Sequence, residues 1–497
     1  MSDESCMYAL GESHDCVVPA KAPNKDRQRS AEGMEGRRSM EENAEKANPS
    51  RTQSREIGSR GLLGVGEAAR KDKGLQFTAL LHHVTERLLL DSFYTLKRQA
   101  APGVDRVTWQ EYAQDVEARI QDLHGRVHRG AYRAQPSRRI YIQKTDGRQR
   151  PLGIAALEDK IVQQAVVTVL NAIYEEDFIG ISYGFRPGRG AHDAWDALTA
   201  GMVWKKVNWI LDADVRGFFD NLTHEHLMQL IQKRVGDPRI LRLIRKWLKA
   251  GVSEDGEWSE TQVGVPQGAV VSPLLANIYL HYVLDQWVMW WRKRYAYGDP
   301  IIVRYADDLV IGFQHGAVAE GFLEQLRERM QGFGLELHPE KTRLIQFGRF
   351  AIEHRRRSGE GKPETFNFPG FTHICGSIHK TGRFTVMRKT IGKRLAAKLK
   401  IIKAELRKRM HEPIQGTGEW LRAVVRGYYN YHAVPGNFSR LRSFRHDVIR
   451  SWWQAVRRRG QRVLRREVFD RIVAQYLPTP MILHPYPLER FRATHPR

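Results

Sequence analysis

Residues 301–313 read IIVRYADDLVIGF. Two short apolar runs, mostly β-branched, flank the adjacent carboxylates Asp307 and Asp308, and this pattern is typical of a β-hairpin with acids at its tip. Paired Asp residues are also common in ordinary turns, so the pattern alone leaves a purely structural interpretation open. The apolar character of both runs and the strongly basic chain favour a second interpretation, a site for Mg²⁺, which prefers hard oxygen ligands.

A two-metal site shares its carboxylates between ions roughly 4 Å apart and therefore needs a further acid. Residues 209–215 read WILDADV, an apolar strand that ends with Asp212 and Asp214 on one face. Spacing does not decide which of these two acids would serve. Residues 216–221, RGFFDN, follow directly.

The tetrad YADD at 305–308 resembles the signature of reverse transcriptases. Residues 214–221, DVRGFFDN, resemble the first carboxylate motif of group II intron-encoded reverse transcriptases. The resemblance implies that Asp214, Asp307 and Asp308 are catalytic and hold two Mg²⁺ ions, with Asp212 as a neighbour. It also implies that Phe219 lies under the sugar of the incoming nucleotide and selects dNTPs. Core packing is the alternative for this side chain.

The resemblance runs from about residue 75 to residue 497 and implies an α+β fold, a right-hand polymerase with fingers, palm and a basic helical thumb. We therefore expect fingers and palm over 71–384 and a helical thumb or maturase (X) domain over 385–497. Residues 1–70 contain few large apolar side chains and predict a disordered or loosely ordered extension. Apolar spacing predicts helices within 75–96 and over 109–129, 158–174 and 318–333.

Charge points to a polyanionic partner. The chain has 497 residues, 41% of them hydrophobic, and a net charge of +24. Residues 383–497 contain 27 Lys and Arg against 7 Asp and Glu, which is +20 of that total. This concentration indicates a nucleic-acid-binding surface more than a solvated face.

Three scattered cysteines favour a reducing compartment. Because no signal peptide or membrane-spanning run is visible, we expect a cytoplasmic protein without a membrane partner.

A second hairpin is predicted over residues 138–154, RRIYIQKTDGRQRPLGI, with Asp-Gly in its turn. A polymerase must neutralise the triphosphate of its nucleotide, and this chain has no glycine-rich phosphate loop for that purpose. Mobile basic side chains on a finger hairpin can do so instead. Together with the resemblance, this favours triphosphate contacts from Lys144 and Arg150. A solvated basic hairpin is the alternative.

Three further segments resemble family motifs. Residues 264–273, GVPQGAVVSP, precede a helix with Ser272 as the expected N-cap, and the resemblance implies that Gln267 and Gly268 line the nucleotide pocket. Lys341 resembles a lysine that protonates the leaving pyrophosphate, and a surface salt bridge is its alternative. Residues 366–371, FNFPGF, resemble the hairpin that grips the primer. Pro369 removes a backbone donor there and puts the hairpin geometry in doubt.

We therefore expect an RNA-directed DNA polymerase in which a primer 3′-OH attacks the α-phosphate of a dNTP. The resemblance adds binding of the parent intron RNA to assist splicing and mobility. The expected partners are group II intron RNA, a DNA primer or target and dNTPs; a homodimer is left open, and no endonuclease domain is expected. A maturase with a splicing role only and a domesticated defence-associated reverse transcriptase are the alternatives. Phe219 disfavours an RNA-dependent RNA polymerase.

Overall fold

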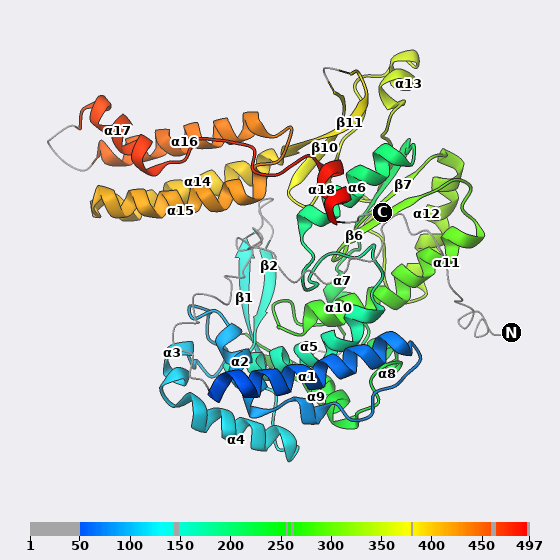
Figure 1. The fold of residues 1–497 in the computed structure, drawn as a ribbon, viewed down its shortest axis with the longest axis vertical. Helices are drawn as coiled ribbons and strands as arrows, with labels where there is room; N and C mark the ends of the chain where they lie inside the picture. Colours follow the sequence, from blue (N-terminus) through cyan, green and yellow to red (C-terminus); the bar gives the residue numbers. More distant parts are fainter. Residues whose placement is uncertain are drawn as a thin grey trace.

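The computed structural model describes residues 50–143, 149–254, 257–259, 263–378, 381–458 and 464–494. Within these residues the strands form three sheets, and long helices surround or extend them (Figure 1). The middle of the chain, coloured green, carries the central sheet and its helices. The C-terminal helices, coloured orange, reach away from that sheet.

The central sheet, which we call the palm sheet, is antiparallel and has the order β6-β7-β3-β8. Its strands are β6 (Ile301–Tyr305), β7 (Asp308–Phe313), β3 (Trp209–Ala213) and β8 (Arg343–Gln346). The expected hairpin is present: Tyr305 pairs with Asp308, which leaves Ala306 and Asp307 as the turn. Strand β3 lies beside β7 with Ala213 opposite Leu309, so both carboxylate motifs reach the same end of the sheet.

Alternation along these strands separates two hydrophobic cores. Leu309 and Ile311 face one core, whereas Val303 and Val310 face the other, as the two-residue period of a strand requires. Helix α6 (Ala191–Trp204) contacts β6, and α12 (Gly316–Gln331) contacts β3 and β7. Both faces of the palm sheet are therefore covered, and only its ends are left for chemistry.

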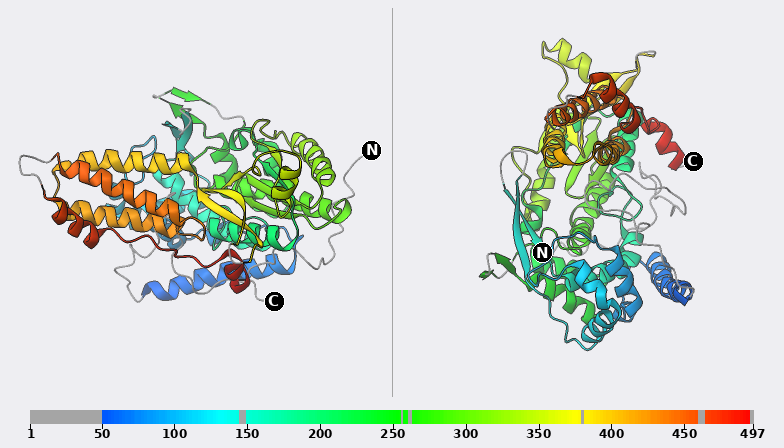
Figure 2. Two further views of the ribbon diagram at one scale, coloured as in Figure 1. Left: turned by 90° about the horizontal axis from the view of Figure 1, so that it is seen from above. Right: turned by 90° about the vertical axis from the view of Figure 1, so that its left-hand side faces the viewer.

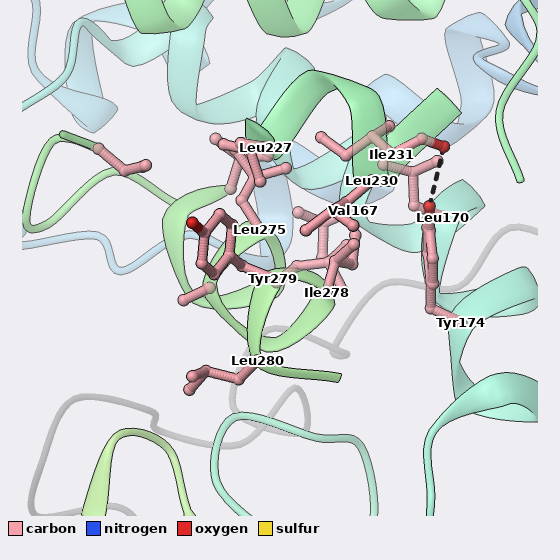
Figure 3. Close-up of a cluster of buried hydrophobic side chains, with 14 of the residues drawn as sticks. Val167, Leu170, Tyr174, Leu227, Leu230, Ile231, Leu275, Ile278, Tyr279 and Leu280 are labelled. Carbon is pink, nitrogen blue, oxygen red and sulfur yellow. Dashed lines mark hydrogen bonds between the residues drawn. The ribbon is translucent and has the colours of Figure 1, made fainter. Parts of the chain in front are cut away.

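The first core continues from the palm sheet into the helices below it. Helices α5 (Leu157–Asp177), α8 (His224–Gln232) and α10 (Ser272–Leu280) meet there. Figure 3 shows side chains of all three in contact, and the Tyr174 hydroxyl donates a hydrogen bond to the carbonyl of Ile231 at 3.2 Å. A π-helical turn, η6 (His281–Asp285), and α11 (Gln286–Arg294) follow α10. This packing fixes where α10 begins, directly after the loop at 264–271.

A second sheet carries the finger hairpin, which consists of β1 (Ser137–Gln143) and β2 (Gln149–Ile154). The sheet order is β2-β1-β4-β5, with β4 (Val252–Glu254) and β5 (Glu257–Ser259), two strands that the sequence pattern did not predict. The helices and short turns of this half of the chain that are not named elsewhere are η4 (Leu81–His83), α2 (Glu86–Thr95), α3 (Trp109–Tyr112), η5 (Ala113–Asp115), α4 (Val116–His128), α7 (Phe218–Asn221) and α9 (Pro238–Lys249). The helix expected over 109–129 is therefore divided, and the helical pattern within 75–96 yields only α2 and the short turn η4.

Helix α1 (Ser50–Lys71) lies in the stretch for which no helical pattern was visible, and it packs against α5. Its C-terminal carbonyl groups are held by a buried arginine on the loop after α8. The Arg234 guanidinium donates to the carbonyls of Ala69 and Asp72 and pairs with Asp177 at 2.8 Å. Residues 1–49 of the expected extension lie outside the described residues.

The third sheet has the order β11-β10-β9 and leads into the thumb, which we define as α14–α17. Its strands are β9 (Phe366–Phe368), β10 (Phe371–Ser377) and β11 (Phe384–Thr390), and α13 (Ala351–Arg357) precedes them. The thumb consists of α14 (Gly392–Lys408), η7 (Arg409–His411), α15 (Ile414–His432), α16 (Phe438–Val456) and α17 (Arg466–Tyr476). Its long helices lie side by side, as Figure 2 shows from above. Finally, α18 (Pro487–Thr494) returns to pack on α6. The expected α+β right-hand architecture is confirmed.

Pro369 does not disturb its hairpin. Phe368 pairs with Phe371 across a two-residue turn of Pro369 and Gly370, and Gly370 has φ +82°. Proline followed by a residue with positive φ is the preferred chemistry of a tight turn, and the missing N–H is not needed there. No helix among the described residues has the length and apolarity needed to cross a membrane.

Candidate polymerase site

The palm sheet brings the predicted carboxylates to one end. The pairing of β3 with β7 ends at Ala213 and Leu309, so Asp214, which comes directly after β3, and Asp308, the first residue of β7, lie at adjacent strand ends. Asp307 occupies the turn beside them. Asp214 is fixed by the segment before β8, because its carbonyl accepts a hydrogen bond from the His338 amide at 2.7 Å.

The mutual repulsion of these carboxylates is visible in their acidities. Loss of hydration, together with the negative charges of Asp307, Asp214 and Asp212, raises the pKa of Asp308 to about 7. The Asp308 residue is exposed at the start of β7. The pKa of Asp307 is raised by burial first and then by Asp214. The site therefore carries excess negative charge that a cation would relieve.

Basic groups from three parts of the chain approach the acids. Lys341 donates a hydrogen bond from Nζ to Asp214 Oδ2 at 2.6 Å. Burial is the largest influence on the pKa of Asp307 and raises it, and the positive charge of Arg150 opposes that rise. Burial raises the pKa of Asp308, and the positive charge of Arg394 in the thumb opposes that rise. Palm, finger hairpin and thumb each direct one positive charge toward the carboxylates.

Asp212 is distinguished from Asp214 by its surroundings. Burial raises the pKa of Asp212 to about 6, and Arg343 on the neighbouring strand β8, 3.5 Å away, opposes that rise. Asp214 instead extends beyond the strand and pairs with Lys341. The geometry thus separates the two acids that spacing left equivalent.

The donor chemistry of the site fits a divalent cation. Carboxylate oxygens are the ligands that Mg²⁺ prefers, and Asp214, Asp307 and Asp308 supply them from neighbouring strand ends. Within the described ranges, however, no three His, Cys, Asp or Glu side chains stand close enough to form a ready metal site.

Three of the candidate nucleotide-binding residues meet where the finger hairpin contacts the loop at 264–271. Arg150 Nε donates to Gln267 Oε1 at 3.0 Å, and Gln267 Nε2 donates to Asp220 at 3.4 Å. The Gly153 amide donates to the Gln267 carbonyl at 2.7 Å. Gly268 has φ +107°, and a Cβ atom there would lie 2.8 Å from the Gly153 carbonyl oxygen, so only glycine permits this close approach.

Phe219 borders the same loop. Its carbonyl accepts a hydrogen bond from the Val265 amide at 2.7 Å, and its ring packs edge-on against Phe218, with 5.3 Å between ring centres. The Phe219 residue is only half-buried, whereas Phe218 is in the core. Its position therefore leaves part of the ring free of core packing. Lys144, the other predicted triphosphate contact, lies outside the described residues.

The loop-to-helix junction differs from the expected cap in one detail. Ser272 is the first residue of α10 instead of its N-cap, and its hydroxyl donates to the Pro266 carbonyl at 2.8 Å. In the thumb, Tyr428, Tyr429 and Trp452 are buried, and Tyr428 stacks on Phe444.

The sequence pattern did not single out Arg304 and Asp285, a fully buried ion pair directly behind the acidic turn. The visible signal was an arginine inside an otherwise apolar strand, because a charged side chain is almost never fully buried unless it is paired. The partner could not be found in this way, since the sequence offers many acids.

Comparison with known proteins gives the chain a family. Residues 142–373 match the family model described as reverse transcriptase (RNA-dependent DNA polymerase). The chain is 33% identical over 335 residues to Protein YkfC of Escherichia coli, covering 59% of this chain and 87% of that protein. It is 40% identical over 185 residues to the group II intron-encoded protein LtrA of Lactococcus lactis subsp. cremoris, covering 37% of this chain and 30% of LtrA.

A further relative comes from a fungus. The uncharacterized 91 kDa protein in the cob intron of Schizosaccharomyces pombe is 41% identical over 166 residues, which cover 33% of this chain and 20% of that protein. The chain thus matches most of YkfC but less than a third of the two intron proteins. Together these similarities show that the chain belongs to the reverse transcriptase family.

Proposed function

We propose that the protein extends a DNA primer on an RNA template with dNTPs and also binds a group II intron RNA to assist its splicing and mobility. The observation that carries the first activity is the meeting of two groups of residues. Asp214, Asp307 and Asp308 lie at the same end of the palm sheet, and the finger residue Arg150, which donates a hydrogen bond to Gln267, acts electrostatically on Asp307. Acids for metal ions and cations for a triphosphate are thus adjacent.

In this proposal Asp214, Asp307 and Asp308 hold two Mg²⁺ ions. When bound, the ions supply activation of the primer 3′-OH and neutralisation of the triphosphate. Arg150 binds the triphosphate by exchanging its hydrogen bond to Gln267 for one to a phosphate oxygen. Lys144 contacts the same group in our proposal. Each charge-assisted bond orients the α-phosphate toward the attacking oxygen.

The remaining candidates have roles in nucleotide selection and proton transfer. Phe219, with part of its ring free of the core, excludes a 2′-OH and so selects dNTPs over NTPs. Gln267 and Gly268 support the base pair from the loop that contacts β2. Lys341 donates a hydrogen bond from Nζ to Asp214 Oδ2 at 2.6 Å, and in this proposal it delivers a proton to the leaving pyrophosphate.

Primer extension tests the polymerase directly. The full chain is incubated with an RNA template, a DNA primer, dNTPs and Mg²⁺, beside Asp307→Ala and the matched control Asp122→Ala, which removes an exposed carboxylate on α4. We expect extension by the intact protein and the control but not by Asp307→Ala. Equal extension by both variants would contradict the assignment of Asp307. No extension by the intact protein would contradict the polymerase function itself.

The thumb carries the proposal of intron RNA binding. In α14, Leu395, Ile402 and Leu406 face the thumb core, whereas Lys400 and Lys403 are exposed. Exposed cations on one face of a helix neutralise phosphates and make binding salt-dependent. Replacing Lys400 and Lys403 together by Gln should weaken binding to a structured intron RNA and reduce the slope of log affinity against log salt by about 1–2. An unchanged slope would contradict this role for α14.

The finer points of location and assembly follow from the same proposal. We place the protein in the cytoplasm, because its RNA and dNTP substrates are accessible there. A homodimer is compatible with the proposal, and sedimentation of the free protein decides it. The acids, Arg150 and Phe219 disfavour a splicing-only maturase, which would not need them. A domesticated defence enzyme would keep the same residues, and the position of the gene beside an intron RNA separates it from a mobile element.

A further inference from the structure

Arg304 lies in the middle of the palm core, immediately behind the acidic turn. It is fully buried on β6 and forms a two-pronged ion pair with the fully buried Asp285, with Nε to Oδ1 at 2.7 Å and Nη2 to Oδ2 at 2.5 Å. A third nitrogen position, Nη1, donates to Asn277 Oδ1 and to the Ala306 carbonyl, both at 2.9 Å. One buried side chain therefore joins η6, α10 and the turn between β6 and β7.

The turn that Arg304 contacts has an unusual backbone. Ala306 has φ +57°, in the left-handed region that residues with a side chain rarely adopt. The backbone of the neighbouring loop packs closely against the same residue: a Cβ atom at Gly184 would lie only 2.3 Å from the Ala306 nitrogen, so glycine is needed there. Asn277 holds that loop by donating from Nδ2 to the Gly184 carbonyl at 2.8 Å. The turn is thus supported from two sides against its own backbone preference.

We infer that Arg304 is a positioning residue for the polymerase reaction: through the Ala306 carbonyl it holds the Ala306–Asp307 peptide in the orientation that presents Asp307 to the metal site. This inference rests on the proposed function. Arg304 touches neither substrate nor reacting atoms and acts through the peptide bond that precedes Asp307. Asp285 fixes the guanidinium plane, and Asn277 ties it to the Gly184 loop.

The contact with Ala306 separates this role from simple core stabilisation. A buried arginine needs an acid to compensate its charge, and Asp285 alone accomplishes that. Arg234 provides the comparison within the same chain: it is also buried, also paired through two nitrogens with an acid, Asp177, and also bonded to main-chain carbonyls. Its carbonyl partners belong to α1 and the segment after it, not to the acidic turn.

The first test compares Arg304→Lys with Arg234→Lys. Lysine keeps the charge but cannot bond Asp285 through two nitrogens and the turn carbonyl at once. For Arg304→Lys we expect kcat in primer extension to fall about tenfold or more, the change expected for one lost charge-assisted hydrogen bond. The half-saturating Mg²⁺ concentration should rise severalfold while the KM for dNTP stays near that of the intact protein. Both variants should lower Tm by similar amounts, because each weakens one buried ion pair. Arg234→Lys, however, should leave kcat and Mg²⁺ dependence unchanged.

A readout independent of turnover is Mn²⁺ binding followed by electron paramagnetic resonance, with Asp307→Ala as the reference for a damaged site. Arg304→Lys should weaken Mn²⁺ binding, and Arg234→Lys should not. If Arg304→Lys loses only thermal stability, with kcat and Mn²⁺ binding unchanged, the positioning role is overturned. If the intact protein binds Mn²⁺ but extends no primer, the polymerase proposal fails, and the Mn²⁺ comparison still decides the role of Arg304.

A double variant covers the case in which Arg304→Lys fails to fold. Asp285→Leu with Arg304→Met replaces the ion pair by apolar side chains of similar size, a change that folded proteins often tolerate. This variant keeps the packing but loses the bond to the Ala306 carbonyl. We expect a folded protein with weak Mn²⁺ binding and little extension. Extension and Mn²⁺ binding equal to those of the intact protein would overturn the inference.

Discussion

Replacing Arg234 by methionine should detach helix α1 from the rest of the fingers. The Arg234 guanidinium bonds the carbonyls of Ala69, Asp72 and Leu75 and both oxygens of Asp177, at distances from 2.8 to 3.3 Å. The side chains of Arg234 and Asp177 are 2% and 7% exposed, so water cannot replace these bonds without opening the structure. The variant would leave one buried carboxylate and three carbonyls without this donor.

The size of the effect follows from that geometry. Removing one partner of a buried pair costs about 3–5 kcal/mol, because the other charge stays buried without compensation. Lys73 Nζ lies 3.6 Å from Asp177 Oδ1 and still offers partial compensation in the variant. We therefore expect the lower end, about 3 kcal/mol. The double variant Asp177→Leu with Arg234→Met removes the unpaired charge and should recover part of the loss.

The pH dependence of this loss has a defined sign. Burial raises the pKa of Asp177, and Arg234 opposes that rise. Without Arg234 the folded-state pKa moves further above the unfolded value, so the neutral acid becomes more favoured on folding. A raised pKa contributes stability at low pH that is lost as pH rises through it. The deficit of Arg234→Met should therefore be larger at pH 8 than at pH 5.

Two measurements check this reasoning. Urea unfolding at both pH values gives the change in free energy, and hydrogen exchange followed by mass spectrometry reports the local opening of α1. We expect faster exchange in peptides covering 61–75 of Arg234→Met and intermediate exchange in the double variant. A loss below about 1 kcal/mol with unchanged exchange would refute the idea that Arg234 joins α1 to the fold.

Three further predictions concern the nucleotide and the fingers. Phe219→Ala should lower the preference for dNTPs over NTPs by about 10- to 200-fold, while Phe219→Tyr keeps it, as single-nucleotide incorporation assays measure; an unchanged preference would contradict the steric role. Arg150→Ala should lower kcat/KM for dNTP by about 10- to 100-fold through the loss of one charge-assisted bond, and an unchanged value in the same assay would exclude the triphosphate contact. Burial raises the pKa of Asp159 to about 6 against hydrogen bonds from Tyr132 and the Gln135 amide, so stability should fall by about 2 kcal/mol as pH rises from 4 to 6. Asp159→Asn should flatten that slope in urea titrations, and a slope that persists would contradict this source.

Local patterns predicted three strands of the palm sheet, β3, β6 and β7, but missed β8 and misjudged the segment before α2. The β6–β7 hairpin is encoded by apolar runs around a turn, which the chain satisfies within thirteen residues. Leu75, Phe77, Leu80 and Leu81 have helical spacing, yet Phe77 forms a parallel bridge with Val235. The amides of Leu80 and Leu81 bond the Asp237 carboxylate at 2.7 and 2.9 Å. Partners more than 150 residues away satisfy this backbone, and periodicity contains no information about them.

The candidate site shows the same division. Motif resemblance placed Asp214, Asp307 and Asp308 together, and the register of β3 on β7 brings their strands to one end of the sheet. The buried support of the turn was not predictable, because Arg304 and Asp285 belong to different elements and either could have paired elsewhere. Local motifs specify the groups that face a substrate, whereas the groups behind them depend on tertiary packing.

The cations around the acids suggest how charge is exchanged when substrate binds. Lys341 pairs directly with Asp214, and the charges of Arg150 and Arg394 oppose the burial that raises the pKa values of Asp307 and Asp308. These three groups come from palm, finger hairpin and thumb. We expect metal ions to take over the compensation of the acids and to leave the basic side chains available for phosphate oxygens.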